Sequence, residues 1–119
     1  MATIAPPTLV HDLFRAIDAR EYERLREICH PEVTYERPGY EAFSGIDRLL
    51  KFYREERVIA SGEHQLTAVV VNDTHATCWG RFVGTHRDGS PIDVEFADTY
   101  VLEDGAIRRR KSFFYVPSV

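Results

Sequence analysis

Hydrophobic and polar residues alternate along the stretch Ile92 to Leu102, IDVEFADTYVL, and this period of two predicts a β-strand. Successive side chains of a strand point to opposite sides, so every second residue shares a face. One face carries the apolar residues Ile92, Val94, Phe96, Tyr100 and Leu102. Asp98 falls on that same face, whereas the opposite face is more polar. The pattern therefore predicts one carboxyl group inside the protein.

A buried Asp98 has a limited set of physical states. Removing an ionised carboxylate from water is costly, so the group must be paired with a cation, held by hydrogen bonds or kept protonated. A perturbed acid in an apolar cleft is a candidate for a functional site, although structural ion pairs also bury acids. Both interpretations, catalysis and a structural salt bridge, stay open at this point.

The dipeptide Asp104-Gly105 predicts a hairpin that returns the chain as a second strand from Ala106 to Tyr115. Two registers are possible. A two-residue loop places Lys111 on the face of Asp98, whereas a three-residue loop with Gly105 in a bulge places Arg110 there. Either register sets a cationic side chain opposite the acid, which then acts as a carboxylate base or as half of an ion pair.

The rest of the pattern predicts an α+β fold. Helical spacing of apolar residues precedes a run of alternating segments, with one early strand between the helices. The expected helices cover residues 8–17, 21–29 and 44–57, and the expected strands cover residues 32–37, 63–71, 75–86, 92–102 and 106–115. We expect residues 1–119 to form a single domain, in which N-terminal helices pack on a strongly curved, mainly antiparallel sheet that encloses a cone-shaped pocket.

Composition excludes several classes of function. The chain has 119 residues, 44% of them hydrophobic, and a net charge of -4, which is typical of a soluble domain with an ordinary core. No apolar run approaches the roughly 18 residues of a membrane span, and no basic and apolar leader begins the chain, so we expect a cytoplasmic protein. The acidity disfavours nucleic acid as a partner, because the basic run Arg108 to Lys111 divides between two faces of a strand.

The cysteine and histidine residues show no spacing typical of metal ligands. Cys29 and Cys78 do not form a CxxC motif, and we expect reduced, buried thiols. The histidines at positions 11, 30, 64 and 75 are scattered along the chain. We therefore expect neither a metal nor an organic cofactor.

Four stretches, in this order and spacing, carry a resemblance over nearly the whole chain: AIDAREYERLREICHPEVTYE, FSGIDRLLKFY, WGRFVGTH and FADTYVLEDGAI. The sequence resembles the SnoaL-like polyketide cyclases and the ketosteroid isomerases of the nuclear transport factor 2-like superfamily. This resemblance implies the cone-shaped fold of that superfamily. It also implies acid/base chemistry without a cofactor, such as isomerisation, aldol-type cyclisation or another proton transfer next to a carbonyl.

The resemblance implies three catalytic candidates. Asp98 falls where the isomerases hold an aspartic acid in the oxyanion hole and where the cyclases have an acid/base. Arg37 falls at the position of the isomerases' proton-shuttling aspartate, and Leu13 falls at the position of the tyrosine that shares their oxyanion hole. A guanidinium does not accept a proton at neutral pH, so a steroid isomerase is not expected. Arg37 is instead expected to stabilise an oxyanion, and the cyclase comparison places His86 near the pocket. Surface exposure is the alternative for both Arg37 and His86.

An apolar, aromatic lining is expected for the pocket, and it suits a small apolar or aromatic ligand, such as a polyketide- or terpenoid-like substrate. The expected substrate-binding residues are Phe14, Ile17, Tyr35, Tyr53, Phe82, Val94, Phe96, Tyr100, Arg110 and Lys111.

Two other functions remain. The first is a module of the same fold that binds a ligand or forms dimers without catalysing a reaction. A homodimer through the outer face of the sheet is expected for an enzyme and for such a module alike, so it does not distinguish them. The residues expected on that face include Val69, Val71, Asp93, Glu95, Thr99 and Val101. Epoxide hydrolysis is a lower alternative, because related cones use an Asp-Arg-Asp set and only Asp98 and a strand arginine are visible here.

Overall fold

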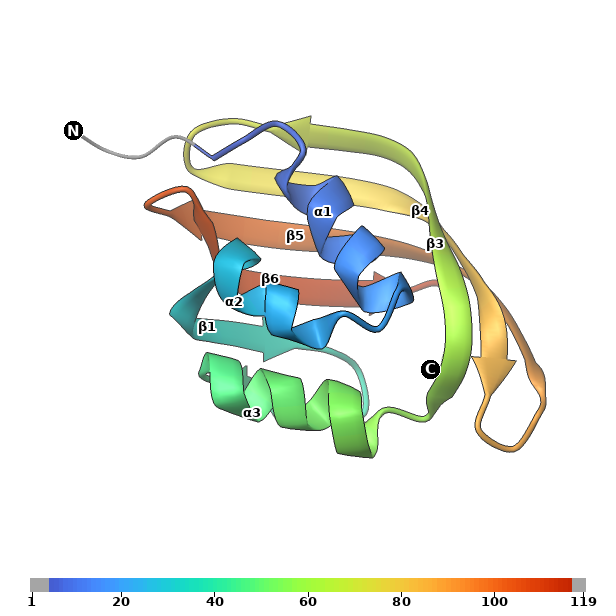
Figure 1. Cartoon of the computed structure of the whole chain (residues 1–119). Helices are drawn as coiled ribbons and strands as arrows, with labels where there is room; N and C mark the ends of the chain where they lie inside the picture. Colours follow the sequence, from blue (N-terminus) through green and yellow to red (C-terminus); the bar gives the residue numbers. More distant parts are fainter. Residues whose placement is uncertain (1–4, 117–119) are drawn as a thin grey trace.

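The fold is one curved sheet with all of its helices on the concave face (Figure 1). It is seen in a computed structural model that describes residues 5–116. The predicted α+β architecture is confirmed. No helix within the described residues is long and apolar enough to cross a membrane.

Three α-helices occur in residues 5–116, and each buries an apolar stripe. They are α1 (Leu9–Asp18), α2 (Leu25–Ile28) and α3 (Ile46–Lys51). A 3-10 turn, Tyr22–Arg24, leads into α2, and a π-helical turn, Phe52–Glu56, continues α3. The expected helix at residues 21–29 is therefore shorter, because Cys29 already begins the first strand. Ser44 does not cap α3, since it lies in a short strand and Gly45 precedes the helix.

The sheet has six strands within the described residues, in the order β2-β1-β6-β5-β4-β3. Only β1 and β6 run parallel, and all other neighbours are antiparallel. The strands are β1 (Cys29–Glu36), β2 (Phe43–Ser44), β3 (Ile59–Val71), β4 (His75–His86), β5 (Pro91–Glu103) and β6 (Ala106–Phe114). The parallel pair joins the early strand to the last one, so residues of β1 and β6 lie side by side despite their separation in sequence.

Bulges and a glycine bend β3 around the helices (Figure 1). The register between β3 and β4 shifts between Ile59 and Ser61 and again between Leu66 and Ala68, and such bulges increase strand bending and twist. Gly80 faces the second shift. A Cβ at this position would lie 2.1 Å from the carbonyl oxygen of Gln65, so only glycine allows the two strands to approach so closely.

The second bulge also decides which side chains of β3 face inward. Val69 and Val71 pack against the core, whereas Val70 is 57% exposed. The expectation that Val69 and Val71 lie on the outer face is therefore wrong, because one extra residue in the strand reverses the alternation that follows it.

The last hairpin combines features of both predicted registers. Asp104 and Gly105 form a two-residue loop with positive φ angles of 52° and 78°, between the paired residues Glu103 and Ala106. The ladder then shifts between Val101 and Leu102, because Arg108 is an extra residue opposite them. This bulge restores the register in which the side chain of Arg110 lies inward beside Asp98, and it turns Lys111 to the outer face, where it is exposed.

Candidate functional site

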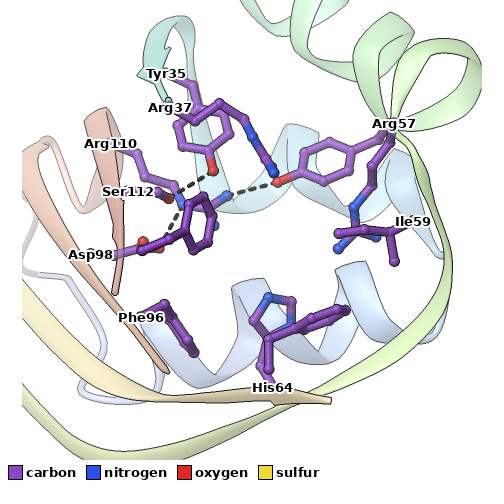
Figure 2. Close-up of a pocket in the computed structure, with 12 residues that line it drawn as sticks. Tyr35, Arg37, Arg57, Ile59, His64, Phe96, Asp98, Arg110 and Ser112 are labelled. Atoms are coloured by element: carbon purple, nitrogen blue, oxygen red, sulfur yellow. Dashed lines mark hydrogen bonds and ion pairs between the residues drawn. The ribbon is translucent and has the colours of Figure 1, made fainter. Parts of the chain in front are cut away.

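A small, partly enclosed cavity lies between the concave face of the sheet and the chain segments that follow β1 and α3 (Figure 2). Its volume of about 20 Å³ gives room for about one water molecule. Polar and aromatic side chains dominate its wall, which is formed by Tyr35, Arg37, Tyr53, Arg57, Ile59, His64, Phe82, Phe96, Asp98, Arg110, Ser112 and Phe114. A groove of about 380 Å³ on the outside of the molecule shares Arg37 and Ser112 with this wall, so it borders the cavity.

Asp98 is fully buried in the cavity wall, as the alternation of β5 predicts. Its Oδ2 atom accepts hydrogen bonds from Arg110 Nε and from the Tyr100 hydroxyl, each 2.8 Å long. Its Oδ1 atom is buried and has no hydrogen-bond partner among the described residues. One oxygen of the Asp98 side chain is therefore held in place, and the other is unused.

Arg110 holds this carboxylate from the neighbouring strand and is itself fixed on several sides. Its Nη1 atom donates a 2.8 Å hydrogen bond to the Tyr53 hydroxyl, and its guanidinium lies 4.3 Å from the centre of the Tyr35 ring. Burial is the largest single effect on the pKa of Arg110 and lowers it, but Asp98 together with Tyr35, Tyr53 and Tyr100 outweighs burial and raises that pKa well above its usual value. Arg110 thus carries its charge at every physiological pH.

The tyrosines beside this pair are kept as neutral hydroxyl groups. Burial raises the pKa of Tyr100 well above its usual value, and the negative charge of Asp98 raises it further. Burial also raises the pKa of Tyr35, against the opposing charges of Arg110 and Arg37. Tyr35 shares a 2.7 Å hydrogen bond with the hydroxyl of Ser112. These hydroxyls orient the site and do not titrate near neutrality.

Arg37 and Arg57 bring two further guanidinium groups to the cavity, one after the end of β1 and one at the start of the segment leading into β3 (Figure 2). They are only 8% and 7% exposed. Neither forms an ion pair or a side-chain hydrogen bond within residues 5–116, and the Nε atom of each is buried without a partner. Aromatic rings surround them instead, at 5.2 Å for Arg37 over Phe52 and at 5.3 Å for Arg57 over Tyr53.

His64 faces the same cavity and is oriented by an aspartate. Its Nδ1 atom lies 2.6 Å from Asp18 Oδ1 at the end of α1, and its backbone N–H donates to Asp18 Oδ2 at 2.8 Å. An ionised carboxylate only accepts hydrogen bonds, so Nδ1 carries the proton and Nε2 is left with a lone pair. The ring stacks on Phe14 at 4.3 Å. This arrangement resembles the aspartate-histidine part of a catalytic triad.

The unsatisfied polar atoms of the structure coincide with this cavity. Within residues 5–116, the buried side-chain nitrogen and oxygen atoms without a hydrogen-bond partner are Arg37 Nε, Arg57 Nε and Asp98 Oδ1, and all three residues line the cavity wall. Buried polar groups in folded proteins are nearly always hydrogen-bonded, and the exceptions gather where a structure has a function. Their coincidence marks this cavity as the candidate functional site.

Seven of the residues expected from the sequence meet in this wall: Asp98, Arg37, Tyr35, Tyr53, Phe82, Phe96 and Arg110. The alternative of surface exposure is wrong for Arg37, because the aromatic residues around it bury the side chain. Tyr100 lies behind the wall, where it bonds to Asp98. Phe14, Ile17 and Val94 are buried in the core and do not line the cavity.

Two expected site residues lie elsewhere. His86 is the last residue of β4, beside the turn to β5, because β4 extends far beyond the cavity. Lys111 is on the outer face of β6, where its Nζ atom is 3.8 Å from a carboxylate oxygen of Glu36. The expected pocket positions of both residues are wrong. The bulge at Arg108 turns the side chain of Lys111 to the outer face, and the length of the β4-β5 hairpin carries His86 away from the cavity.

Arg57, His64 and Asp18 were not expected in the site. His64 did carry a signal, because it alternates with Gly62 and Leu66 along β3 and so shares their inward face. No pattern in the sequence indicated that Arg57 lies in the site, since the direction of its side chain depends on how the π-helical turn passes into β3. No pattern indicated Asp18 either, because its contact with His64 joins residues that are 46 positions apart.

The thiols contribute no nucleophile to this site. Burial raises the pKa of Cys78 to about 11, and burial raises that of Cys29 to about 12. Both cysteines are free and remain protonated near neutrality. Residues 5–116 contain no group of three or more histidine, cysteine, aspartate or glutamate side chains placed to share a metal ion.

The buried state of His64 predicts a dependence of stability on pH. Burial lowers the pKa of His64, with Asp18 opposing this effect. The unfolded chain therefore takes up a proton as the pH falls below about 6.5 while the folded chain resists it, so folding stability falls with pH. We expect the melting temperature to decrease between pH 6.5 and pH 5 in the natural protein and to vary less in His64→Gln. Thermal denaturation across this range tests the prediction, with His86→Gln as the control; parallel curves for His64→Gln and the natural protein would contradict it.

Comparison with known proteins assigns the family. Residues 10–110 match the model of the SnoaL-like domain, which is most of the chain. The protein therefore belongs to the SnoaL-like family. No protein of curated function matches the sequence.

Solved structures show the same fold at low sequence identity. A protein with a ketosteroid isomerase-like fold from Catenulispora acidiphila DSM 44928, in complex with trimethylamine, has a TM-score of 0.83 at 16% identity, covering 97% of this chain and 91% of its own. A protein assigned as a SnoaL-like polyketide cyclase from Jannaschia sp. CCS1 has a TM-score of 0.78 at 18% identity, covering 90% and 83%. An LEH-like epoxide hydrolase from M. tuberculosis has a TM-score of 0.78 at 12% identity, covering 91% and 80%. The predicted nuclear transport factor 2-like fold is thereby confirmed.

Proposed function

We propose that the protein is a cofactor-independent enzyme that moves a proton at a carbon next to a carbonyl group. The observation that carries this proposal is the unused Oδ1 atom of Asp98, which is buried in the wall of a cavity that also contains two unpaired guanidinium groups. A base and an oxyanion-stabilising cation in one water-poor cavity are the requirements of enolate chemistry. SnoaL-like relatives of known structure include a protein assigned as a polyketide cyclase, which supports the same class of reaction.

The proposed step balances as a proton transfer. Asp98 takes a proton from the carbon next to the carbonyl, and the electron pair of the broken C–H bond moves to the carbonyl oxygen, which becomes an enolate. Arg110 and Tyr100 hold the carboxylate in position through its other oxygen. The guanidinium of Arg37 or Arg57 stabilises the negative oxygen, as preorganised donors do in other sites of this kind. Return of the proton to the same or another carbon gives exchange or isomerisation.

His64 supplies the second proton-transfer group of this proposal. The aspartate at position 18 fixes the ring so that Nε2 is the atom left to accept or return a proton. Figure 2 shows His64 across the cavity from Asp98 and Arg37. A substrate between these side chains would contact a base on either side, which suits a reaction in which a proton leaves one atom and returns to another.

The lining also suits a substrate with an apolar part, because Ile59, Phe82 and Phe96 contribute hydrophobic surface to the wall. A volume of about 20 Å³ has room for about one water molecule, so even a small substrate has to displace a side chain of the wall and extend into the bordering groove. We therefore propose a small substrate that enters from the bordering groove as the side chain of Arg37 moves.

Epoxide hydrolysis has less support than proton transfer. The structural similarity to an LEH-like epoxide hydrolase at 12% identity concerns the fold alone. Among the described residues, Asp98 is the one carboxylate in the cavity wall, so a second acid of an Asp-Arg-Asp set is missing from it.

Exchange of hydrogen for deuterium tests the proposed reaction without knowledge of the natural substrate. We expect the protein in D₂O to catalyse loss of the proton signal next to the carbonyl in at least one member of a panel of small ketones, aldehydes and keto acids, followed by NMR. The heat-inactivated protein is the first control. Exchange no faster than in buffer across the whole panel would overturn the proposal and favour a module that only binds its ligand.

We further propose a homodimer through the outer face of the sheet. Trp79 and Phe113 are 45% and 46% exposed and flank Ala97 in neighbouring strands, so the three residues form an apolar stripe. An exposed stripe of this kind favours association with another surface. We expect the natural protein to have the mass of a dimer by light scattering and Trp79→Glu to have that of a monomer, with Arg15→Glu, a change of a 75% exposed side chain on α1 away from the outer face of the sheet, as the control. A monomeric natural protein would refute this arrangement.

A further inference from the structure

The cavity has a strong excess of positive charge. Its wall contains the guanidinium groups of Arg37, Arg57 and Arg110 but a single carboxylate, that of Asp98. This carboxylate is already paired with Arg110 through a 2.8 Å contact. Asp18 lies behind His64 and bonds to that ring and to its backbone N–H. Arg37 and Arg57 are thus left without an anionic partner within residues 5–116.

Burial of these two groups is costly unless something compensates their charge. Arginine is seldom buried without a partner, because a guanidinium loses strong hydration on leaving water. The aromatic rings compensate in part: Arg37 has four rings within 6.0 Å, and Arg57 lies 5.3 Å and 5.7 Å from two. Ring faces attract a cation but accept no directed N–H bonds of normal strength. The buried Nε atoms of both residues remain unsatisfied.

We propose that this cavity binds a small organic carboxylate, held by the guanidinium groups of Arg37 and Arg57. A guanidinium presents parallel N–H donors that match the two oxygens of a carboxylate. The two arginines come from separate segments and reach the same cavity, so a ligand between them would receive donors from both (Figure 2). The apolar side chains of the wall favour a carboxylate that carries a short apolar body over inorganic phosphate, which has no apolar part. Because the cavity itself has room for about one water molecule, this apolar body would extend into the bordering groove.

The position of Arg37 supports a route into this site. Arg37 lines both the cavity and the groove of about 380 Å³ on the outside, so an anion in the groove meets this guanidinium first. Lys111 also lines the groove and adds a positive charge, which the carboxylate of Glu36 at 3.8 Å partly offsets. The inference rests on the proposed function where it names the substrate, which would be a carbonyl compound that carries a carboxylate. Binding of the anion itself does not depend on turnover.

Calorimetry and thermal denaturation with benzoate, propanoate, their neutral amides and inorganic phosphate test the inference. Benzoate has no hydrogen that can be removed next to its carbonyl group, so its binding is separate from catalysis. We expect the carboxylates to bind and to raise the melting temperature, and the amides to do neither. Equal binding of amide and carboxylate, or binding of phosphate alone, would overturn the inference.

Variants assign the binding to the two arginines. Arg37→Met and Arg57→Met should each weaken benzoate binding about 10- to 100-fold, the effect of losing charged hydrogen bonds. Arg57→Lys keeps the charge without the forked donors and should lie between these variants and the natural protein. Arg15→Met is the matched control, because the Arg15 side chain is 75% exposed on α1.

A purely structural role for these arginines gives a different result. If they bind a ligand, the ligand-free methionine variants should melt at or above the temperature of the natural protein, because an unpaired buried charge has been removed. Lower melting temperatures in all three arginine variants, with benzoate affinity unchanged in Arg57→Lys, would assign a structural role and overturn the inference. Absence of deuterium exchange with normal benzoate binding would refute the proposed reaction and leave the anion site intact.

Discussion

Asp98→Asn is expected to destabilise the folded chain by about 3–5 kcal/mol, because it removes one partner of a buried ion pair and leaves the other charge uncompensated. Arg110 is 7% exposed and has no second carboxylate within reach in the described part of the chain. For a domain of 119 residues this loss corresponds to a decrease in melting temperature of roughly 10–20 °C.

A double-mutant cycle tests this prediction. Arg110→Met alone should be similarly damaging, because it leaves the carboxylate of Asp98 buried without its cation. The combination Asp98→Asn with Arg110→Met should cost much less than the sum of the single changes, within about 2 kcal/mol of the natural protein, since well-packed neutral residues often replace a buried pair at little cost. Urea unfolding of the four proteins measures these free energies. Additive effects would show that the two side chains do not depend on each other for stability.

The second large effect is expected on the rate of proton exchange. Asp98→Asn should reduce exchange by about 10²- to 10⁴-fold, which is the usual contribution of a general base. The double variant with Arg110→Met should be equally inactive while remaining folded, and this separates lost chemistry from lost stability. His64→Gln should also slow exchange by about 10²-fold, because its Nε2 atom is the second proton acceptor in the cavity.

The pH profile distinguishes a chemical role of His64 from a structural one. Burial lowers the pKa of His64, so its neutral form should dominate at neutral pH and become protonated only in more acidic solution. The exchange rate of the natural protein should therefore fall on the acid side, and Asp18→Asn should shift or remove that limb, since the aspartate fixes the tautomer. His86→Gln, at the far end of β4, should retain the natural profile. A His64→Gln variant with full activity would exclude His64 from the reaction.

The inward position of Asp98 was predictable because it depends on alternation alone. Side chains of a strand change sides at every residue, and β5 pairs from Pro91 to Val101 with β4 without a register shift. The same rule failed for β6 and for the end of β3. Single extra residues, at Arg108 and next to Leu66, reverse the alternation there. No residue type in the sequence marks these positions as bulges.

The sequence by itself determined the α+β class, the order of the longer elements without the short strand β2, and the single acid on the inner face of β5, because these follow from periodicity, turn residues and charge along neighbouring positions. It did not determine that Arg37, Arg57 and His64 meet Asp98 in one cavity. Those contacts join segments far apart in the chain, and they depend on the parallel pairing of β1 with β6, on the π-helical turn after α3 and on the curvature of β3. Only the tertiary structure fixes such geometry, since it depends on how distant segments pack and not on the order of residues within any one of them.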